Sequence, residues 1–460
     1  MWTPSLNDRP GPKYLRIADA LAEDVYAGRL AAGDRLPTHR DLAWKLGVTV
    51  GTVSRAYAEA ERRGLVVGEV GRGSFVRPGA RSAATLDMPH EAGPQAIELG
   101  MNRPPSQINV PEFAQALAEM SRSSDLANLM NYQAHTGRWE HRAAGAAWLS
   151  RRGLCVDADG VMLTSGAEHA VAAALMGLTD PGDVVLVENL TWSGVRAIAS
   201  LQRLSLKPVA MDQDGLLPDA FEAACKTSGA RMLYTMPTIH NPTTSIMPAD
   251  RRAAIAEIAR AYGITIVEDD VYGFLAEGAP PALAAYAPER TIYITAASKS
   301  LAPCLRVGFA AVPVDRIGRF SAASRALNWM APPVTAEIVA RWINDGTADL
   351  LAERVVRETQ ARQRVAADLL EGLDYRSAPA SFHIWLHLPE PWRAQDLVAA
   401  ARARGISLTS TELFVPGRAE TPHAVRVSIS ATPDRAQLVQ GLSMLAQVLR
   451  EEPEPCLAVA

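Results

Sequence analysis

Lys299 is the residue whose position in the chain most directly suggests chemistry. It follows a short β-branched run, Thr291–Thr295, and Arg306 comes seven residues later at the start of the apolar run 307–312. A lysine at a strand end can lose enough hydration to act as an amine nucleophile, as a Schiff base requires. An arginine can bind an anion through two hydrogen bonds. Taken alone, however, a lysine between two strands is more often a solvated loop residue.

Three upstream segments carry residues that could bind a ligand. Ser165, Gly166 and Ala167 open a helix, and free N–H groups at a helix start can bind phosphate, although an ordinary N-cap has the same pattern. Trp192 follows a strand end and could stack on a ring, or it could simply fill space. Asn241 precedes a proline and could hold a phenolic oxygen, or it could only form the turn.

The carboxylate of Asp269 stands near the end of an apolar strand, three residues before Tyr272. A buried carboxylate is costly unless a cation faces it, and a protonated pyridine nitrogen would serve.

Short apolar runs alternate with helical stretches and must position these residues. Because the runs are apolar on both faces, they predict a mainly parallel sheet buried between helices, with ligands at the strands' carboxyl ends. The expected strands are 183–188, 231–235, 263–269 and 291–295, with helices near 112–120 and 143–152.

From about residue 99 to 448 the chain resembles the class I/II aminotransferases of fold type I, which use pyridoxal 5'-phosphate (PLP). The resemblance rests on the order of these segments and on Ser298-Lys299 followed by Arg306-Val-Gly; Ala296 departs from the serine common there. It implies that Lys299 forms the internal aldimine, that Asp269 pairs with the pyridinium nitrogen and that Trp192 stacks on the ring. It further implies that Tyr272 and Asn241 bind the ring oxygen. The implied phosphate ligands are Ser165, Gly166, Ala167, Ser298 and Arg306.

Two more residues acquire roles from this resemblance. Tyr132 matches a tyrosine donated by the neighbouring subunit, and Arg426 matches the arginine that binds a substrate α-carboxylate. For both residues the match includes the neighbouring sequence. Arg426 lies on an expected strand of a smaller C-terminal α+β domain. His383 and His387 are four apart on another such strand, but a metal site there is a remote alternative.

The first eighty residues show a different pattern. Apolar residues at helical spacing end before Gly28, Thr38 and Asp41 form a capping pattern before a short helix, and Gly47 and Thr49 separate that helix from the next. Two strands then flank a glycine-rich tip that contains Arg72. This order predicts a winged helix-turn-helix.

Residues 13–76 resemble the DNA-binding domain of the GntR family. The resemblance rests on Gly-Asp-x-Leu-Pro, Leu-Gly-Val-Thr, Thr-Val and Gly-x-Gly, and it implies DNA contacts from the helices and the wing; Val50 departs from the polar residue frequent in the family. A small residue lets the helix backbone approach DNA, and arginine can reach phosphate or guanine. The alternative is a winged helix used only for protein contacts. The predicted DNA-binding residues are Arg40, Thr49, Gly51, Thr52, Ser54, Arg55 and Arg72.

Size and composition agree with a multidomain protein. At 460 residues two or three domains are expected, and no signal-peptide or membrane-spanning run appears. Four cysteines without metal-site spacing favour reduced thiols and a cytoplasmic location. Residues 1–80 carry 12 Lys and Arg against 9 Asp and Glu, whereas the chain's net charge is −4. A basic head on an acidic body weakly indicates a polyanionic partner.

The two halves together resemble the MocR subfamily of bacterial regulators. We predict a winged helix-turn-helix over 1–76, a linker over 77–95 and an aminotransferase-like α/β body over 96–455, whose small subdomain starts near 345. The expected function is a PLP-dependent, DNA-binding transcriptional regulator, a homodimer that senses an amino-group effector or PLP itself. The alternative is an active aminotransferase that carries a DNA-binding head. The effector and the operator are not indicated.

Overall fold

The structure is a computed structural model that describes residues 2–4, 6, 12–26, 29–31, 33–62, 65–69, 73–76, 96–416 and 421–451. The described residues form two compact units, one up to residue 76 and the other from residue 96. Each unit is considered by itself. The predicted linker 77–95 and the wing residue Arg72 lie outside the described residues.

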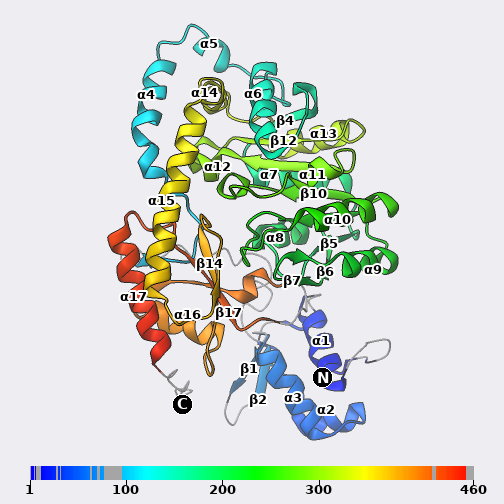
Figure 1. The fold of residues 1–460 in the computed structure, drawn as a ribbon. Helices are drawn as coiled ribbons and strands as arrows, with labels where there is room; N and C mark the ends of the chain where they lie inside the picture. The colour runs from blue at the N-terminus through cyan, green and yellow to red at the C-terminus, as the bar shows by residue number, and fades with distance from the viewer. Residues whose placement is uncertain are drawn as a thin grey trace. The chain divides into compact units, whose positions relative to one another are not determined.

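The N-terminal unit is the predicted winged helix-turn-helix. Its elements are α1 (Lys13–Tyr26), α2 (His39–Leu46), α3 (Val50–Arg62), β1 (Val66–Glu69) and β2 (Gly73–Val76) (Figure 1). The two strands pair antiparallel, and Leu36 adds a backbone hydrogen bond to Ser74. The face of α3 that carries Val53, Ala56 and Tyr57 is buried, as its helical spacing predicts.

Both caps predicted in this unit are present. The Thr38 hydroxyl accepts a hydrogen bond from the Asp41 N–H at 3.2 Å, and the Thr49 hydroxyl accepts one from the Thr52 N–H at 3.1 Å. Gly47 ends α2 with φ of +61°, a conformation that glycine adopts without a steric cost. These local signals fix where α2 ends and α3 begins.

The second unit is built on a seven-stranded sheet in the order β4-β12-β11-β10-β9-β5-β6. β12 runs antiparallel to both of its neighbours, and the other adjacent pairs are parallel. The strands are β4 (Val161–Thr164), β5 (Val184–Glu188), β6 (Ser205–Val209), β9 (Met232–Thr235), β10 (Thr265–Asp269), β11 (Thr291–Ala296) and β12 (Gly308–Ala311).

Helices cover both faces of this sheet. Alternate residues of one strand, such as Val185 and Leu186 on β5, belong to different apolar cores, so the sheet is buried on both sides. One core includes α7 (Ala167–Leu178), α8 (Ser193–Leu201) and α13 (Ile317–Leu327). On the other face lie α9 (Pro218–Ser228), α10 (Ala249–Ala261) and α11 (Leu283–Tyr286), and also α6 (Trp139–Leu149), α14 (Pro333–Asn344) and α4 (Val110–Met120). The short helices α5 (Leu126–Leu129) and α12 (Ala297–Ser300) and the ribbon of β7 (Met211–Asp212) and β8 (Gly215–Leu216) complete this part.

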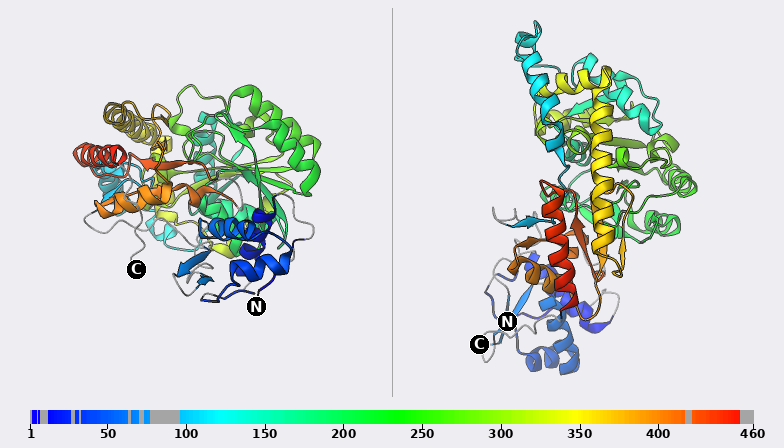
Figure 2. Two further views of the ribbon diagram at one scale, coloured as in Figure 1. Left: turned by 90° about the horizontal axis from the view of Figure 1, so that it is seen from below. Right: turned by 60° about the vertical axis from the view of Figure 1, so that its left-hand side comes forward.

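The C-terminal part contains an antiparallel four-stranded sheet in the order β13-β14-β17-β16. The long helix α15 lies against α17, as Figure 2 shows. The start of the body joins this part, because β3 pairs in parallel with β15, a contact that the sequence pattern does not indicate. The elements are α15 (Thr347–Leu369), β13 (Tyr375–Arg376), β14 (His383–His387), α16 (Ala394–Ala403), β15 (Ile406–Ser407), β16 (Thr409–Ser410), β17 (Ala424–Ser428), α17 (Arg435–Arg450) and β3 (Ile97–Glu98).

The four strands expected from the sequence are all present, and none of them begins more than two residues after its predicted start. β4 and β6 were not predicted. Among the described residues, no helix has the length and apolar character needed to cross a membrane.

Candidate cofactor site and DNA-binding head

The predicted cofactor residues lie where the strands of the large sheet end. Ser165 follows β4, Asp269 ends β10, and Lys299 lies in α12 directly after β11. Because β4, β10 and β11 point the same way, these ends share one edge of the sheet, which is where open α/β sheets bind ligands.

Lys299 is half-buried at this edge. Its Nζ donates a hydrogen bond to the backbone oxygen of Asn102 at 2.5 Å and lies 6.0 Å from the centre of the Tyr272 ring. Loss of hydration lowers the pKa of Lys299 to about 8; the Arg426 guanidinium adds to this effect, while Asp269 opposes it. The amine is therefore partly neutral, and nucleophilic, near neutral pH.

Asp269 is a buried carboxylate of which one oxygen is hydrogen-bonded. Its Oδ2 accepts a hydrogen bond from the Tyr234 hydroxyl at 2.9 Å, whereas its buried Oδ1 has no hydrogen-bond partner. Burial raises the pKa of Asp269 to about 6, although the Tyr234 hydrogen bond opposes the rise. An unpartnered buried carboxylate oxygen is costly and has the geometry to accept a hydrogen bond from a protonated ring nitrogen.

Arg306, Ser165 and Gly166 come together at the start of α7. The Arg306 Nη2 donates to the Ser165 carbonyl at 2.9 Å, and its Nη1 lies 3.5 Å from the Ser298 hydroxyl. Gly166 has φ of +95°, and a Cβ there would lie 2.8 Å from the Arg306 Nη2. Arg306 itself has φ of +51°, a left-handed conformation that costs a non-glycine residue about 1 kcal/mol or more. A glycine and a strained backbone thus hold an exposed guanidinium at a helix N-terminus.

This N-terminus suits a phosphate. The N-cap of α7 is Gly166, which makes no side-chain hydrogen bond to the first N–H groups of the helix, so no cap competes with an anion there. The Ser165 N–H is bound by His169 Nδ1 at 3.0 Å, and the Ser165 hydroxyl accepts from Asn328 Nδ2 at 2.5 Å. Neither His169 nor Asn328 was singled out from the sequence, because His169 follows the Ser165-Gly166-Ala167 segment inside the helix and Asn328 lies after a helix with no motif around it.

Arg426 is buried and carries several hydrogen bonds. Its Nη1 donates to Asn241 Oδ1 at 2.9 Å, and its Nη2 donates to the Gly100 carbonyl and to the Thr409 hydroxyl. Its Nε has no partner, and burial lowers its pKa to about 10. The predicted carboxylate-binding arginine therefore lies beside Asn241, one of the predicted ring-oxygen ligands.

Asn102 links the two parts of the body, and sequence reasoning missed it. Its Nδ2 donates to the Tyr272 hydroxyl at 3.1 Å and lies 2.9 Å from Nδ1 of His383 on β14. Its backbone oxygen receives the Lys299 hydrogen bond. Asn102 lies 170 residues or more from each of these partners, so no local pattern points to it.

The remaining predicted residues differ in their surroundings. Trp192 is half-buried, and its ring centre lies 6.5 Å from that of Tyr234, the partner of Asp269. Tyr132 has 82 % of its surface exposed and meets only the Trp329 ring among aromatic side chains of the described residues. Where the structure describes the chain, Tyr132 has no ring contact with Trp192 or Tyr272. In the described part of the chain, no cluster of three His, Cys, Asp or Glu residues suited to a metal is found.

Of the predicted DNA-binding residues that the structure describes, Arg40 lies on α2, Thr49 directly precedes α3, and the others lie on the first turns of α3. Arg40 is exposed, and the hydroxyls of Thr49 and Thr52 lie 2.9 Å apart. Ser54 is 3.2 Å from Nδ1 of His39. Arg55 is exposed but stacks over the Tyr14 ring at 4.3 Å, so its guanidinium is held toward α1.

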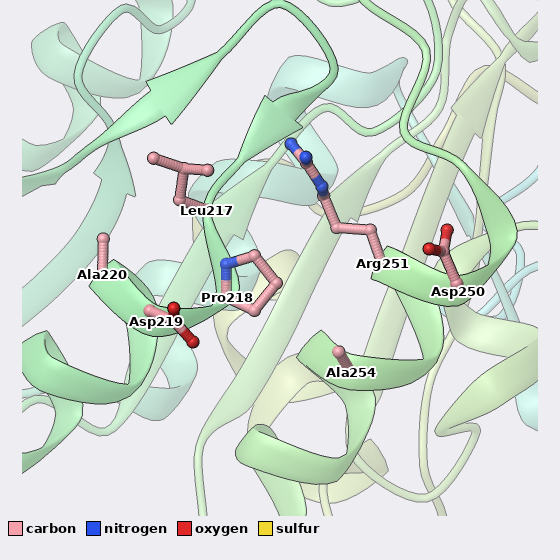
Figure 3. Close-up of a pocket in the computed structure, with 7 residues that line it drawn as sticks. All are labelled: Leu217, Pro218, Asp219, Ala220, Asp250, Arg251 and Ala254. Atoms are coloured by element: carbon pink, nitrogen blue, oxygen red, sulfur yellow. The ribbon is translucent and has the colours of Figure 1, made fainter.

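Two surface hollows contain none of the predicted cofactor residues. One, of about 430 Å³, lies between α4 and α14. The other, of about 480 Å³, lies between the first turns of α9 and α10, where Asp219 and Asp250 disfavour an anion and Arg251 is paired with Asp212. Its lining residues are Leu217, Pro218, Asp219, Ala220, Asp250, Arg251 and Ala254 (Figure 3).

The residues of the Lys299 site fit PLP. The free Asp269 oxygen could accept a hydrogen bond from a pyridinium nitrogen, and the partly neutral Lys299 amine could react with an aldehyde. Arg306 with Ser165 and Gly166 at the start of α7, here called the phosphate cradle, could bind a phosphate. The fold and this site define an aminotransferase-like body joined in one chain to a winged helix-turn-helix head.

Comparison with known proteins agrees with this definition. Residues 94–445 match the aminotransferase class I and II family, and residues 13–76 match the bacterial regulatory proteins of the gntR family. The chain therefore belongs to the aminotransferase class I and II family and carries a GntR-type helix-turn-helix domain, the domain arrangement of MocR regulators. It is a transcriptional regulator with an aminotransferase-like domain.

Two relatives match this chain along nearly its whole length. YdeF of Bacillus subtilis, an uncharacterized HTH-type transcriptional regulator, is 32% identical over 97% of this chain and 96% of its own. The HTH-type transcriptional regulator TauR of Rhodobacter capsulatus is 25% identical over 95% of this chain and 96% of its own.

Solved structures show the fold of the body. An archaeal alanine:glyoxylate aminotransferase gives a TM-score of 0.73 at 22% identity, over 78% of this chain and 91% of its own. The α-aminoadipate aminotransferase LysN of Thermus thermophilus gives a TM-score of 0.72 at 23% identity, over 80% of this chain and 96% of its own. Homologues with this fold depend on PLP.

Proposed function

We propose that this protein is a DNA-binding transcriptional regulator that holds PLP at Lys299 and responds to an amino-group effector or to PLP itself. The observation that carries the proposal is that a partly neutral lysine and a buried carboxylate with one free oxygen lie at the same edge of the sheet, in a chain with a GntR-type head. Such buried groups are costly without a ligand, and a regulator that binds one gains stability from it.

Each side chain of the site has a task in this proposal. Bound PLP would supply an aldehyde that reacts with primary amines, and the Lys299 amine and the amine of an effector would compete for it. Asp269 orients the ring nitrogen and keeps it protonated, and the Arg306 guanidinium with the start of α7 holds the phosphate. Arg426 holds the effector's carboxylate in place of its present contact with Asn241.

The signal must reach the head through a difference in binding. An effector changes DNA affinity only if it binds two arrangements of the protein with different free energies. Asn102, which contacts Lys299 and also His383 of the small sheet, gives the effector site a direct connection to the C-terminal part. We expect a homodimer that presents two heads to two DNA half-sites and acts in the cytoplasm.

Lys299→Ala tests the cofactor. The purified protein, incubated with PLP and then freed of unbound PLP, should stay yellow, and the variant should lose most of this absorbance because it lacks the amine that reacts with the aldehyde. Lys226→Ala, which removes an exposed lysine paired with Glu222, is the matched control and should stay yellow. Absorbance spectra measure both, and a colourless parent protein would contradict the proposal.

A second candidate function is transamination of an amino acid. It is favoured by the presence of Lys299, Asp269, Tyr272 and Arg426 in one site. Steady turnover of amino acids with 2-oxoglutarate, without effector-dependent DNA binding, would support the enzyme. Effector-dependent binding to operator DNA that weakens with salt and with Arg40→Ala would support the regulator.

A further inference from the structure

The start of α3 carries an exposed apolar side chain where a polar one would ordinarily bind DNA. Val50, the first residue of α3, has 44% of its surface exposed and is the position at which the sequence departs from the GntR pattern. In winged helix-turn-helix domains the N-terminal residues of this helix meet the base edges of the major groove. An exposed valine there loses water when DNA binds.

The polar side chains around Val50 are engaged within the head. The hydroxyls of Thr49 and Thr52 lie 2.9 Å apart, and the Thr49 hydroxyl also accepts the Thr52 N–H. Ser54 is bonded to His39, and the Arg55 guanidinium lies over the Tyr14 ring. Among the described apolar side chains of these first two turns, Val50 is exposed, whereas Val53, Ala56 and Tyr57 are buried.

Gly51 supplies an independent observation. A Cβ built on it meets only the Thr49 hydroxyl oxygen, at 3.9 Å, and its backbone is not in the left-handed region. Nothing inside the head therefore requires glycine, although glycine weakens a helix relative to alanine. A glycine that the fold does not need is explained by a molecule that approaches the helix from outside.

We propose that Val50 and Gly51 form a reader for thymine. Gly51 lets the start of α3 approach the base pairs, and the Val50 methyl groups pack against the C5-methyl group of a thymine in each half-site of the operator. The thymine methyl is the apolar group that the major groove presents, and apolar side chains are its usual partners. The proposal rests on the proposed DNA-binding function and adds the base that this position selects.

The test removes the Val50 methyl groups and the thymine C5-methyl group, first separately and then together. Duplexes are selected from a randomised library with the full-length chain in the presence of PLP, and each thymine of a recovered duplex is then replaced by deoxyuridine. At one position per half-site the parent protein should lose about fourfold in affinity, the value of one buried methyl group. Val50→Ala should bind the thymine and uracil duplexes equally.

Two further variants complete the design. Val67→Ala removes a similarly exposed valine of β1, with 37% of its surface exposed, and should retain the uracil penalty. Gly51→Ala should weaken binding to every recovered duplex by roughly tenfold or more, while its thermal unfolding midpoint stays the same or rises, because alanine favours the helix.

The outcomes separate this proposal from the proposed function. Thymine reading by Val50 would be overturned if replacing thymine by deoxyuridine lowered the affinity at no position. It would also be overturned if the replacement lowered the affinity of Val50→Ala as much as that of the parent protein. Unchanged binding by Gly51→Ala would overturn the close approach. If the chain recovers no duplex at all, DNA binding itself fails and the thymine proposal fails with it.

Discussion

At the scale of single residues, burial acts on Lys299 and Asp269 in opposite directions. It lowers the pKa of the amine to about 8 and raises the pKa of the carboxyl to about 6, because both charged forms lose water. Each shift costs the free protein stability at neutral pH and prepares the group for a ligand. Residues that destabilise the fold in this way concentrate at functional sites.

Asp269→Asn should stabilise the protein without cofactor above pH 6. The pKa of Asp269 is raised from 3.8 to about 6 in the folded state, so the folded chain binds the proton more tightly than the unfolded chain. The free energy of unfolding therefore falls as pH rises from 4 to 7, and this group accounts for about 3 kcal/mol of that fall at most. Asparagine can still accept from Tyr234 and does not ionise. Denaturant unfolding between pH 4 and 7 should therefore show a shallower decline in the variant.

Exposed Asp219→Asn is the control for this experiment and should leave the decline unchanged. The same Asp269→Asn protein should bind PLP more weakly, since it lacks the negative charge that faces the ring nitrogen. An identical pH dependence in parent and variant would show that Asp269 is not destabilised by burial.

At the scale of elements, the phosphate cradle depends on how closely β12 passes the start of α7. Gly308 opens β12, and a Cβ there would lie 2.6 Å from the Thr164 hydroxyl oxygen and 2.8 Å from the Gly166 carbonyl carbon. Because backbone cannot give way as a flexible side chain can, this glycine sets the distance between β12, the end of β4 and the helix that follows.

Gly308→Ala should destabilise the body by about 1–3 kcal/mol, the usual cost of overpacking, and should weaken binding of PLP and of inorganic phosphate. Gly318→Ala on α13 is a matched control, because a Cβ there meets nothing within 4 Å and alanine favours a helix. Denaturant unfolding and phosphate titration measure both effects. Equal stability of the two variants would contradict the close packing at Gly308.

At the scale of the whole molecule, the body exposes large apolar side chains on the segment that carries Tyr132. Met130 and Tyr132 are 79% and 82% exposed, and Trp329, with 49% exposed, contacts the Tyr132 ring. Exposed apolar surface of this kind favours burial against a partner. A second copy of the chain would bury it.

Met130→Asp should therefore shift the protein from dimer to monomer, because a charge would have to be buried at the contact. Val314→Asp, at a residue that is 86% exposed, is the control and should leave the assembly unchanged. Sedimentation velocity over a range of concentrations distinguishes the two. A parent protein that stays monomeric at micromolar concentration would contradict the homodimer.

The sequence by itself determined the local features of both units. Caps at Thr38 and Thr49, the left-handed Gly47 and the apolar face of α3 follow from residue types and spacing, and so do the central strands. β4 and β6 were missed because single short strands carry no distinctive period. Lys299, Asp269 and Arg306 could be picked out because each stands at or within three residues of a strand end, where a local pattern is informative.

Only the tertiary structure decided which distant residues meet. Asn102 reaches Lys299 across 197 residues, and Arg426 reaches Asn241 across 185. The pairing of β3 with β15 brings the start of the body to the C-terminal sheet, and that pairing places Gly100 and Asn102 at the site. Such contacts depend on how sheets and crossovers are arranged in space, and local propensity reports only on neighbours along the chain.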